Sequence, residues 1–155
     1  HIKSKMNLQE QILRIQEMMF INDDNVNDRF YKLDSKLVEI FKKIEKDYGE
    51  TLTIKSGFRD KETNEKMGGA SNSAHLRGLA IDIKFNTPNR EGIKKLITLA
   101  TKHGILGIGV YRDAKDLHID IDESLGRRSW GPDYSPNTIP QWAKNEVSKH
   151  LKNQK

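Results

Sequence analysis

Two short stretches of the chain alternate between apolar and other side chains, and this period of two constrains the fold more than any other feature. Residues 79–85 read LAIDIKF, and residues 116–122 read DLHIDID. Such alternation is typical of β-strands that pack one face on a core. It places Asp82 opposite the apolar side chains of the first strand. In the second strand it places four side chains opposite the apolar ones, namely Asp116, His118, Asp120 and Asp122.

The segments around these strands mostly favour helices. Apolar residues recur there at intervals of three and four. Amphipathic helices are therefore expected over 7–20, 28–48, 90–103 and 141–151. A short polar helix is also expected over 60–67. Further strands are expected over 52–54 and 107–111. An Asn-Asp run after the first helix predicts a turn or linker.

The expected organisation is an amphipathic helix with its linker over 1–27, followed by one domain over 28–155. The expected class of that domain is α+β, with a small antiparallel sheet flanked by helices.

Composition limits the kinds of site and partner. The chain has 155 residues and no cysteine, which excludes disulfides, thiolate zinc sites and cysteine nucleophiles. The formal net charge of +5 favours anionic partners. Because no basic stripe is interleaved with aromatic residues, nucleic acid is not expected among them. No run approaches the roughly 18 apolar residues of a membrane helix, and no secretory signal is visible at the N-terminus. Stable membrane insertion is therefore not expected.

Two histidines and one aspartate form a candidate metal site. Asp82 and His118 lie on the polar faces of two predicted strands, and His75 belongs to the loop before the first strand. Adjacent strands would present both side chains to one point, which His75 can reach. Two imidazoles and one carboxylate are the ligand set of a catalytic zinc that keeps one position open to water. Asp120 suits a carboxylate that orients a ligand imidazole, and Ser73 either hydrogen-bonds in the site or stabilises its loop.

Four motifs that follow one another carry a resemblance to a known family. They are SGFR at 56–59, GGASNSAHLRGLAID at 68–82, GVYRDAKDLHIDI at 109–121 and RRSWG at 127–131. Over about 52–131 their order resembles the M15 group of zinc peptidases. That group comprises D-alanyl-D-alanine carboxypeptidases and murein endopeptidases, including phage endolysins. The resemblance implies a fold shared with the hedgehog signalling domain.

The resemblance also implies roles for individual residues. It assigns ligation of Zn²⁺ to His75, Asp82 and His118, and it places Arg59 near the carbonyl or carboxylate of the substrate. A guanidinium at that place can stabilise a tetrahedral oxyanion or hold a peptide carboxylate.

The identity of the general base depends on a departure from the family pattern. Several members have a glutamate three residues before the last ligand, where this chain has Lys115. Others have a histidine two residues before it, where this chain has Asp116. Because strand alternation puts Asp116 on the same face as His118, we expect Asp116 to be the base, with Asp113 as the alternative.

These observations lead to an expected function and two alternatives. The expectation is a peptidase that cuts peptidoglycan stem peptides at the bacterial cell wall, as a phage lysin, a virion-associated protein or an exported protein. Which peptide bond is cut stays open. One alternative is a non-catalytic, zinc-stabilised binding module, because hedgehog relatives use the fold for recognition. The other is a phage structural protein that self-associates or docks on a particle through residues 7–20, a role that is compatible with the enzyme.

Overall fold

The computed structural model describes residues 7–15 and 28–152. The chain divides into two compact units, His1–Tyr31 and Lys32–Lys155. None of the helices in the described residues combines the length and the hydropathy that a membrane-spanning segment requires.

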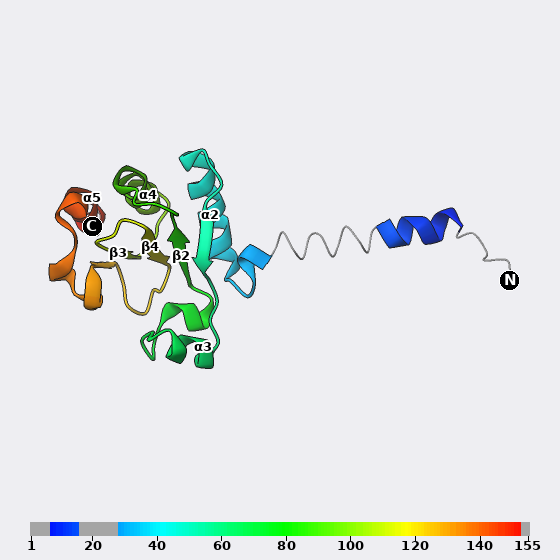
Figure 1. Cartoon of the computed structure of the whole chain (residues 1–155), viewed down its shortest axis with the longest axis horizontal. Coiled ribbons are helices and arrows are strands. Elements are labelled where there is room, and N and C mark those ends of the chain that lie inside the picture. The colour runs from blue at the N-terminus through cyan, green and yellow to red at the C-terminus, as the bar shows by residue number, and fades with distance from the viewer. Residues whose placement is uncertain (1–6, 16–27, 153–155) are drawn as a thin grey trace. The chain divides into compact units, whose positions relative to one another are not determined.

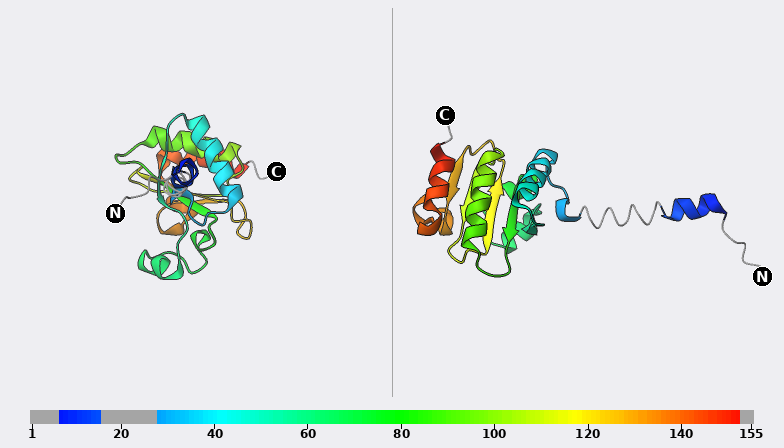
Figure 2. Two further views of the ribbon diagram at one scale, coloured as in Figure 1. Left: turned by 90° about the vertical axis from the view of Figure 1, so that its right-hand side faces the viewer. Right: turned by 90° about the horizontal axis from the view of Figure 1, so that it is seen from above.

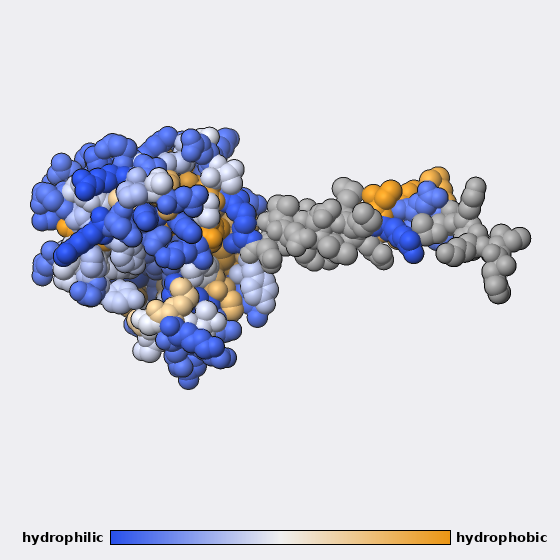
Figure 3. All heavy atoms as spheres, in the orientation of Figure 1, coloured by the Kyte–Doolittle hydropathy of each residue, from blue (hydrophilic) through white to orange (hydrophobic). Residues whose placement is uncertain are grey.

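The first unit contains the N-terminal helix that the apolar spacing predicts. Residues 8–15 are helical, whereas 16–20 of the predicted helix and the predicted linker over 21–27 lie outside the described residues. The apolar side chains of this helix are exposed and show as an orange patch in Figure 3; they are Leu8, Ile12, Leu13 and Ile15.

A mixed five-stranded sheet lies at the centre of the second unit (Figure 1). The strands lie in the order β1-β2-β4-β3-β5. Their bounds are Thr53–Ser56 (β1), Ala80–Lys84 (β2), Gly107–Val110 (β3), Asp116–Asp120 (β4) and Arg128–Trp130 (β5). The α+β class is thus confirmed. The expected antiparallel pairing is found for β1 with β2, β2 with β4 and β4 with β3, whereas β5 at one edge pairs in parallel with β3. The three residues of β5 are too few to show an alternating pattern.

Three helices cover one face of this sheet, as Figure 2 shows. They are α2 (Ser35–Tyr48), α4 (Arg90–Lys102) and α5 (Lys144–Lys152), and α4 packs against both of the others. The short helix α3 (Lys61–Lys66) lies on the opposite side, together with the 3₁₀ turn η2 (Ala74–Arg77). Four further 3₁₀ turns are η1 (Asp28–Phe30), η3 (Pro132–Tyr134), η4 (Pro136–Thr138) and η5 (Gln141–Ala143).

The second predicted helix begins later than its apolar pattern indicates. Lys32 has a left-handed backbone with φ of 51°, which ends any helical run from residue 28. The Asp34 side chain then accepts hydrogen bonds from the backbone N–H groups of Lys36 and Leu37, so α2 starts at Ser35. The prediction of one continuous helix over 28–48 is therefore wrong for its first turns.

The core lies between the sheet and the three covering helices. It is built from the apolar faces of the alternating strands and from the inward sides of α2 and α4; its largest fully buried side chains include Leu37, Phe41, Ile44, Ile81, Ile83, Ile93, Leu96, Ile97, Leu117 and Ile119. Because these residues occupy one face of β2 and β4, the polar side chains between them gather on the other face. That second face carries the candidate site.

Candidate metal centre

His75 is held by the turn η2 before β2. The Ser73 hydroxyl caps this turn by accepting a hydrogen bond from the His75 backbone N–H at 3.3 Å, so the structure gives Ser73 a loop-stabilising contact. The His75 ring is 2% exposed, and its Nδ1 donates to the Gly57 carbonyl oxygen at 2.7 Å. Since the carbonyl can only accept, Nδ1 carries the proton and Nε2 keeps its lone pair for a metal.

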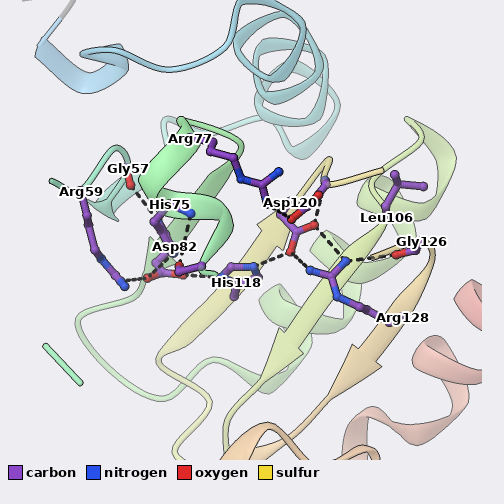
Figure 4. Close-up of polar contacts among 12 residues, drawn as sticks. Gly57, Arg59, His75, Arg77, Asp82, Leu106, His118, Asp120, Gly126 and Arg128 are labelled. Carbon is purple, nitrogen blue, oxygen red and sulfur yellow. Dashed lines mark hydrogen bonds and ion pairs between the residues drawn. The ribbon is translucent and has the colours of Figure 1, made fainter. Parts of the chain in front are cut away.

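Asp82 and His118 meet because their strands pair in this register. They lie directly opposite each other in the antiparallel β2–β4 ladder, where facing side chains come close together. His118 Nδ1 lies 3.1 Å from Asp82 Oδ1, and His75 Nε2 lies 3.2 Å from Asp82 Oδ2 (Figure 4). The aspartate therefore bridges the two imidazoles.

The three side chains form a donor set that fits a zinc ion. Each offers one ligand atom, and these atoms all lie within 4.8 Å of one another. Among residues 7–15 and 28–152 this is the one group of three or more metal-ligating side chains that meets this spacing. Two nitrogens and one oxygen leave a tetrahedral zinc with a fourth position for water or substrate.

The ionisation of the cluster reflects its buried hydrogen bonds. Burial raises the pKa of Asp82, but hydrogen bonds from His118 and His75 outweigh it, so this pKa lies well below its ordinary value. Burial lowers the pKa of His118, yet hydrogen bonds to Asp120 and Asp82 raise it to about 9. A metal at this centre therefore competes with a proton on His118.

Asp120 lies behind His118, as the strand alternation predicts. His118 Nε2 donates to Asp120 Oδ2 at 2.7 Å, which leaves Nδ1 facing Asp82. The Asp120 carboxylate is fully buried and also contacts the Arg128 guanidinium at 2.8 Å. Its pKa is low, because the hydrogen bond from His118 and the charges of His118 and Arg128 outweigh the effect of burial.

Arg59 contacts the candidate ligands from the SGFR motif. Its Nη2 donates to Asp82 Oδ2 at 2.8 Å, and its Nε donates to the Ser56 hydroxyl at 2.8 Å. Its backbone N–H also donates to the His75 carbonyl at 3.1 Å, which ties the motif to η2. The side chain is 11% exposed and faces the cavity above the cluster.

A cavity of about 540 Å³ opens on the cluster. The candidate ligands line one part of it with Arg59, Ser73 and Tyr111. The other part is lined mainly by residues after β4, among them Leu125, Arg127, Arg128, Trp130, Tyr134 and Pro136. The size is ordinary for a small-molecule or peptide site.

Both candidate bases have polar contacts outside the cluster. Asp116 lies two residues before His118 on the same strand, and its Oδ2 accepts from Lys55 Nζ at 2.7 Å. Asp116 is not among the residues that line the cavity. Asp113 accepts a hydrogen bond from the Lys115 backbone N–H at 3.1 Å in the turn between β3 and β4. Neither contact tests the role of base, which stays a prediction.

Tyr111 is a cavity residue that the sequence reasoning missed. It directly follows β3 and lines the cavity with Asp82 and His118. Burial and the nearby charges of Asp82, Tyr134 and Asp116 raise its pKa to about 12. The phenol is therefore protonated near neutral pH and can donate a hydrogen bond. Gly109 lies opposite His118, so the period of two in β3 already puts position 111 on the face of the site.

The comparisons with known proteins place this site in a family. The family model for peptidase M15 matches residues 6–120, which include all three candidate ligands. The match begins well before the region of resemblance at about 52–131, and it ends before the RRSWG motif. No curated protein matches the chain significantly. Since the family match covers well over half of the sequence, the chain belongs to the peptidase M15 family.

Proposed function

We propose that the protein is a zinc peptidase that hydrolyses peptide bonds in the stem peptides of bacterial peptidoglycan. Membership of the M15 family implies a metallopeptidase. The observation that carries the proposal is the His75–Asp82–His118 donor set at the wall of a cavity. Gly57 and Asp120 bind the opposite nitrogens of the two imidazole rings, and so they direct the ligand nitrogens toward Asp82.

Zinc at this centre would supply a Lewis acid that polarises a peptide carbonyl and lowers the pKa of a bound water to about 7. His75 and His118 would hold it through Nε2 and Nδ1, and Asp82 would hold it through its carboxylate. The hydrogen bonds of His75 to Gly57 and of His118 to Asp120 keep the ligand nitrogens in place before substrate arrives.

Arg59 and Tyr111 are the donors for the substrate carbonyl oxygen. Both line the cavity next to the candidate ligands. Negative charge develops on that oxygen in the transition state, and donors placed beforehand around it lower the barrier. Arg59 is positioned by its hydrogen bonds to Asp82 and Ser56, while Tyr111 remains protonated because of its raised pKa.

Asp116 is the proposed general base. It shares the face of His118 and carries a carboxylate that can take a proton from water and return it to the leaving amine. Its Oδ2 is paired with Lys55, so proton transfer uses Oδ1 or follows release from that lysine. Asp113 is the reserve candidate; its carboxylate stabilises the neighbouring turn.

The substrate and the place of action are inferred from charge and from the family. The formal net charge of +5 suits the anionic bacterial wall, and Arg127 lines the cavity, where its charge suits a carboxylate of a stem peptide. We therefore place the activity at the bacterial cell wall, in a phage lysin, a virion-associated protein or an exported protein.

One observation favours a second candidate function. The pairing of Asp116 with Lys55, together with Lys115 where relatives have a glutamate, suits a zinc-stabilised binding module that does not turn over substrate. The exposed apolar residues of helix 8–15 suit self-association or docking on a particle in either case.

The proposal is tested by digesting purified peptidoglycan and analysing the released muropeptides by mass spectrometry. Products that disappear with a zinc chelator establish the peptidase, and the mass lost identifies the bond. Asp116→Ala should abolish turnover while zinc is retained. His103→Ala is a matched control, because His103 pairs with Asp47 and does not line the cavity. A zinc-loaded protein that releases no product would support the binding module instead.

A further inference from the structure

Two cross-strand rows connect the candidate metal ligands to the far edge of the sheet. In one row Asp82, His118, Gly109 and Trp130 are successive register partners. In the next row on the same face the register partners are Ala80, Asp120, Gly107 and Arg128. Each row thus runs from β2 through β4 and β3 to β5. In both rows the β3 position is a glycine.

The two glycines of β3 leave a strip without side chains between β4 and β5. A Cβ at position 107 would overlap the Asp120 carboxylate. A Cβ at position 109 would lie 2.8 Å from Trp130 Nε1, which is closer than packed atoms allow, and 3.1 Å from His118 Cβ, which is a tight contact. Side chains of β5 can therefore cross β3 and touch side chains of β4.

Arg128 crosses this strip and holds Asp120 with two hydrogen bonds. Its Nη2 donates to Oδ2 at 2.8 Å, and its Nη1 donates to Oδ1 at 3.2 Å and to the Gly126 carbonyl at 3.1 Å (Figure 4). The Asp122 backbone N–H adds a further bond to Oδ1 at 3.1 Å. A fork of this kind fixes the plane of a carboxylate as well as its position.

Trp130 crosses the strip over the second glycine. Its ring centroid lies 5.0 Å from that of His118, and the Arg128 guanidinium carbon lies 5.0 Å from the Trp130 centroid. Arg128 therefore reaches His118 by two routes, through the Asp120 carboxylate and through the indole ring. His118 itself is left with Nδ1 directed at Asp82.

We infer that Arg128 is a positioning residue for the metal ligand His118, and that β5 acts as a brace which holds this ligand across the two glycines of β3. The inference rests on the proposed zinc centre. Arg128 does not touch the metal; it fixes Asp120, which fixes the orientation and tautomer of the imidazole. Outer partners of ligand histidines of this kind contribute about 10- to 100-fold to metal affinity.

The test is the zinc dissociation constant, measured by competition with a chromophoric chelator in the absence of substrate. Arg128→Met keeps much of the apolar stem and removes the fork, so it should weaken zinc binding by about 10- to 100-fold. Arg128→Lys keeps the charge without the fork and should recover only part of this loss. Gly107→Ala, which displaces Asp120, should weaken binding in the same direction.

Arg77→Met is the matched control. Arg77 also pairs with a buried aspartate, Asp122, near the end of β4, but it does not line the cavity. Its loss should change zinc affinity by less than about twofold. Far-UV circular dichroism in the presence of chelator establishes that each variant is folded. The visible spectrum of the Co²⁺ form reports the geometry of the ligands. This spectrum should change in Arg128→Met and stay unchanged in Arg77→Met.

A double-mutant cycle separates positioning from general stabilisation. Because Arg128 acts through Asp120, Arg128→Met should have little further effect on zinc affinity in an Asp120→Asn background. If the Arg128→Met protein is folded, binds zinc within twofold of wild type and has an unchanged Co²⁺ spectrum, the positioning role of Arg128 is contradicted. The proposed peptidase function is not affected by that result. If the wild-type protein does not bind zinc, the proposed function is contradicted, and the positioning role of Arg128, which depends on it, is contradicted as well.

Discussion

At the scale of single residues, both candidate ligand histidines have one ring nitrogen occupied by the protein and the other directed at Asp82. The Gly57 carbonyl accepts the hydrogen bond from His75, and the Asp120 carboxylate accepts the one from His118. The two partners differ in charge, since one is a neutral carbonyl and the other a carboxylate. The Asp120 carboxylate helps to raise the pKa of His118, and this should appear in the pH dependence of metal binding.

Zinc affinity should rise with pH over an unusually wide range. His118 has a pKa of about 9 in the metal-free protein, so it is protonated below that pH and must lose its proton to bind metal. Affinity should fall by about tenfold for each pH unit below 9, because one proton is displaced, whereas an ordinary histidine would level off near 6.5. Chelator competition between pH 6.5 and 9, corrected for the chelator, measures the slope. In Asp120→Asn the affinity should stop rising at a lower pH than in wild type. A wild-type affinity that does not change with pH above 7 would contradict the expectation.

Removing the Tyr111 hydroxyl should slow turnover without affecting the metal. Tyr111→Phe deletes one donor for the developing oxyanion, which is worth about 10²-fold in kcat at comparable sites. Zinc affinity should stay within twofold of wild type. Tyr48→Phe is the control, because the Tyr48 ring packs near Phe85 and does not line the cavity. Steady-state kinetics on a defined muropeptide gives both values, and an unchanged kcat would exclude Tyr111 from the reaction.

At the scale of elements, periodicity predicted the strands that carry the ligands. β2 and β4 alternate over five or more residues and pack one apolar face on the core, so their pattern is clear, and Asp82 and His118 are found on the predicted face. β5 was missed because three residues show no period. The role of Gly107 and Gly109 depends on strand neighbours that are distant in sequence. Asp116 pairs with Lys55 of β1, which is distant in sequence, so no local pattern predicts this ion pair.

The start of α2 was misjudged because apolar spacing continues through the break at Lys32. The capping residue Asp34 fixes the start of α2, and its contribution to the free energy of unfolding can be measured by substitution. Asp34→Ala should lower the free energy of unfolding by about 1 kcal/mol, since it removes the acceptor for two backbone N–H groups. Asp34→Asn should cost far less, because asparagine is an equally good N-cap. Urea denaturation of the two variants measures the difference, and equal losses would argue against the cap.

At the scale of the whole molecule, a buried histidine joins the closing helix to the rest of the domain. His150 on α5 is fully buried. Its Nε2 donates to the Leu106 carbonyl before β3 at 3.1 Å, and its Nδ1 lies 3.3 Å from Arg127 Nη1 and 3.2 Å from Thr101 Oγ1 on α4. Burial lowers its pKa, as does the charge of Arg127, while the hydrogen bond to Leu106 and the charge of Asp120 oppose this.

The domain should therefore lose stability in mild acid through His150. The unfolded chain takes up a proton on this histidine near pH 6.5, whereas the folded protein resists it to lower pH, so the free energy of unfolding falls as pH decreases below 6.5. Above 6.5 both states are neutral and the contribution is constant. His150→Gln should show a smaller fall between pH 6.5 and 5 than wild type, measured by urea denaturation with chelator present in both. Parallel curves would show that His150 is not the group responsible.

The direct opposition of Asp82 and His118 has a consequence for how correctly folded molecules can be recognised. A slip of β2 against β4 by one residue turns one of these two side chains toward the core. A slipped chain keeps nearly the same helix and strand content but can no longer assemble the three ligands. Retention of zinc by refolded protein should therefore distinguish native molecules from slipped ones that give the same circular dichroism spectrum.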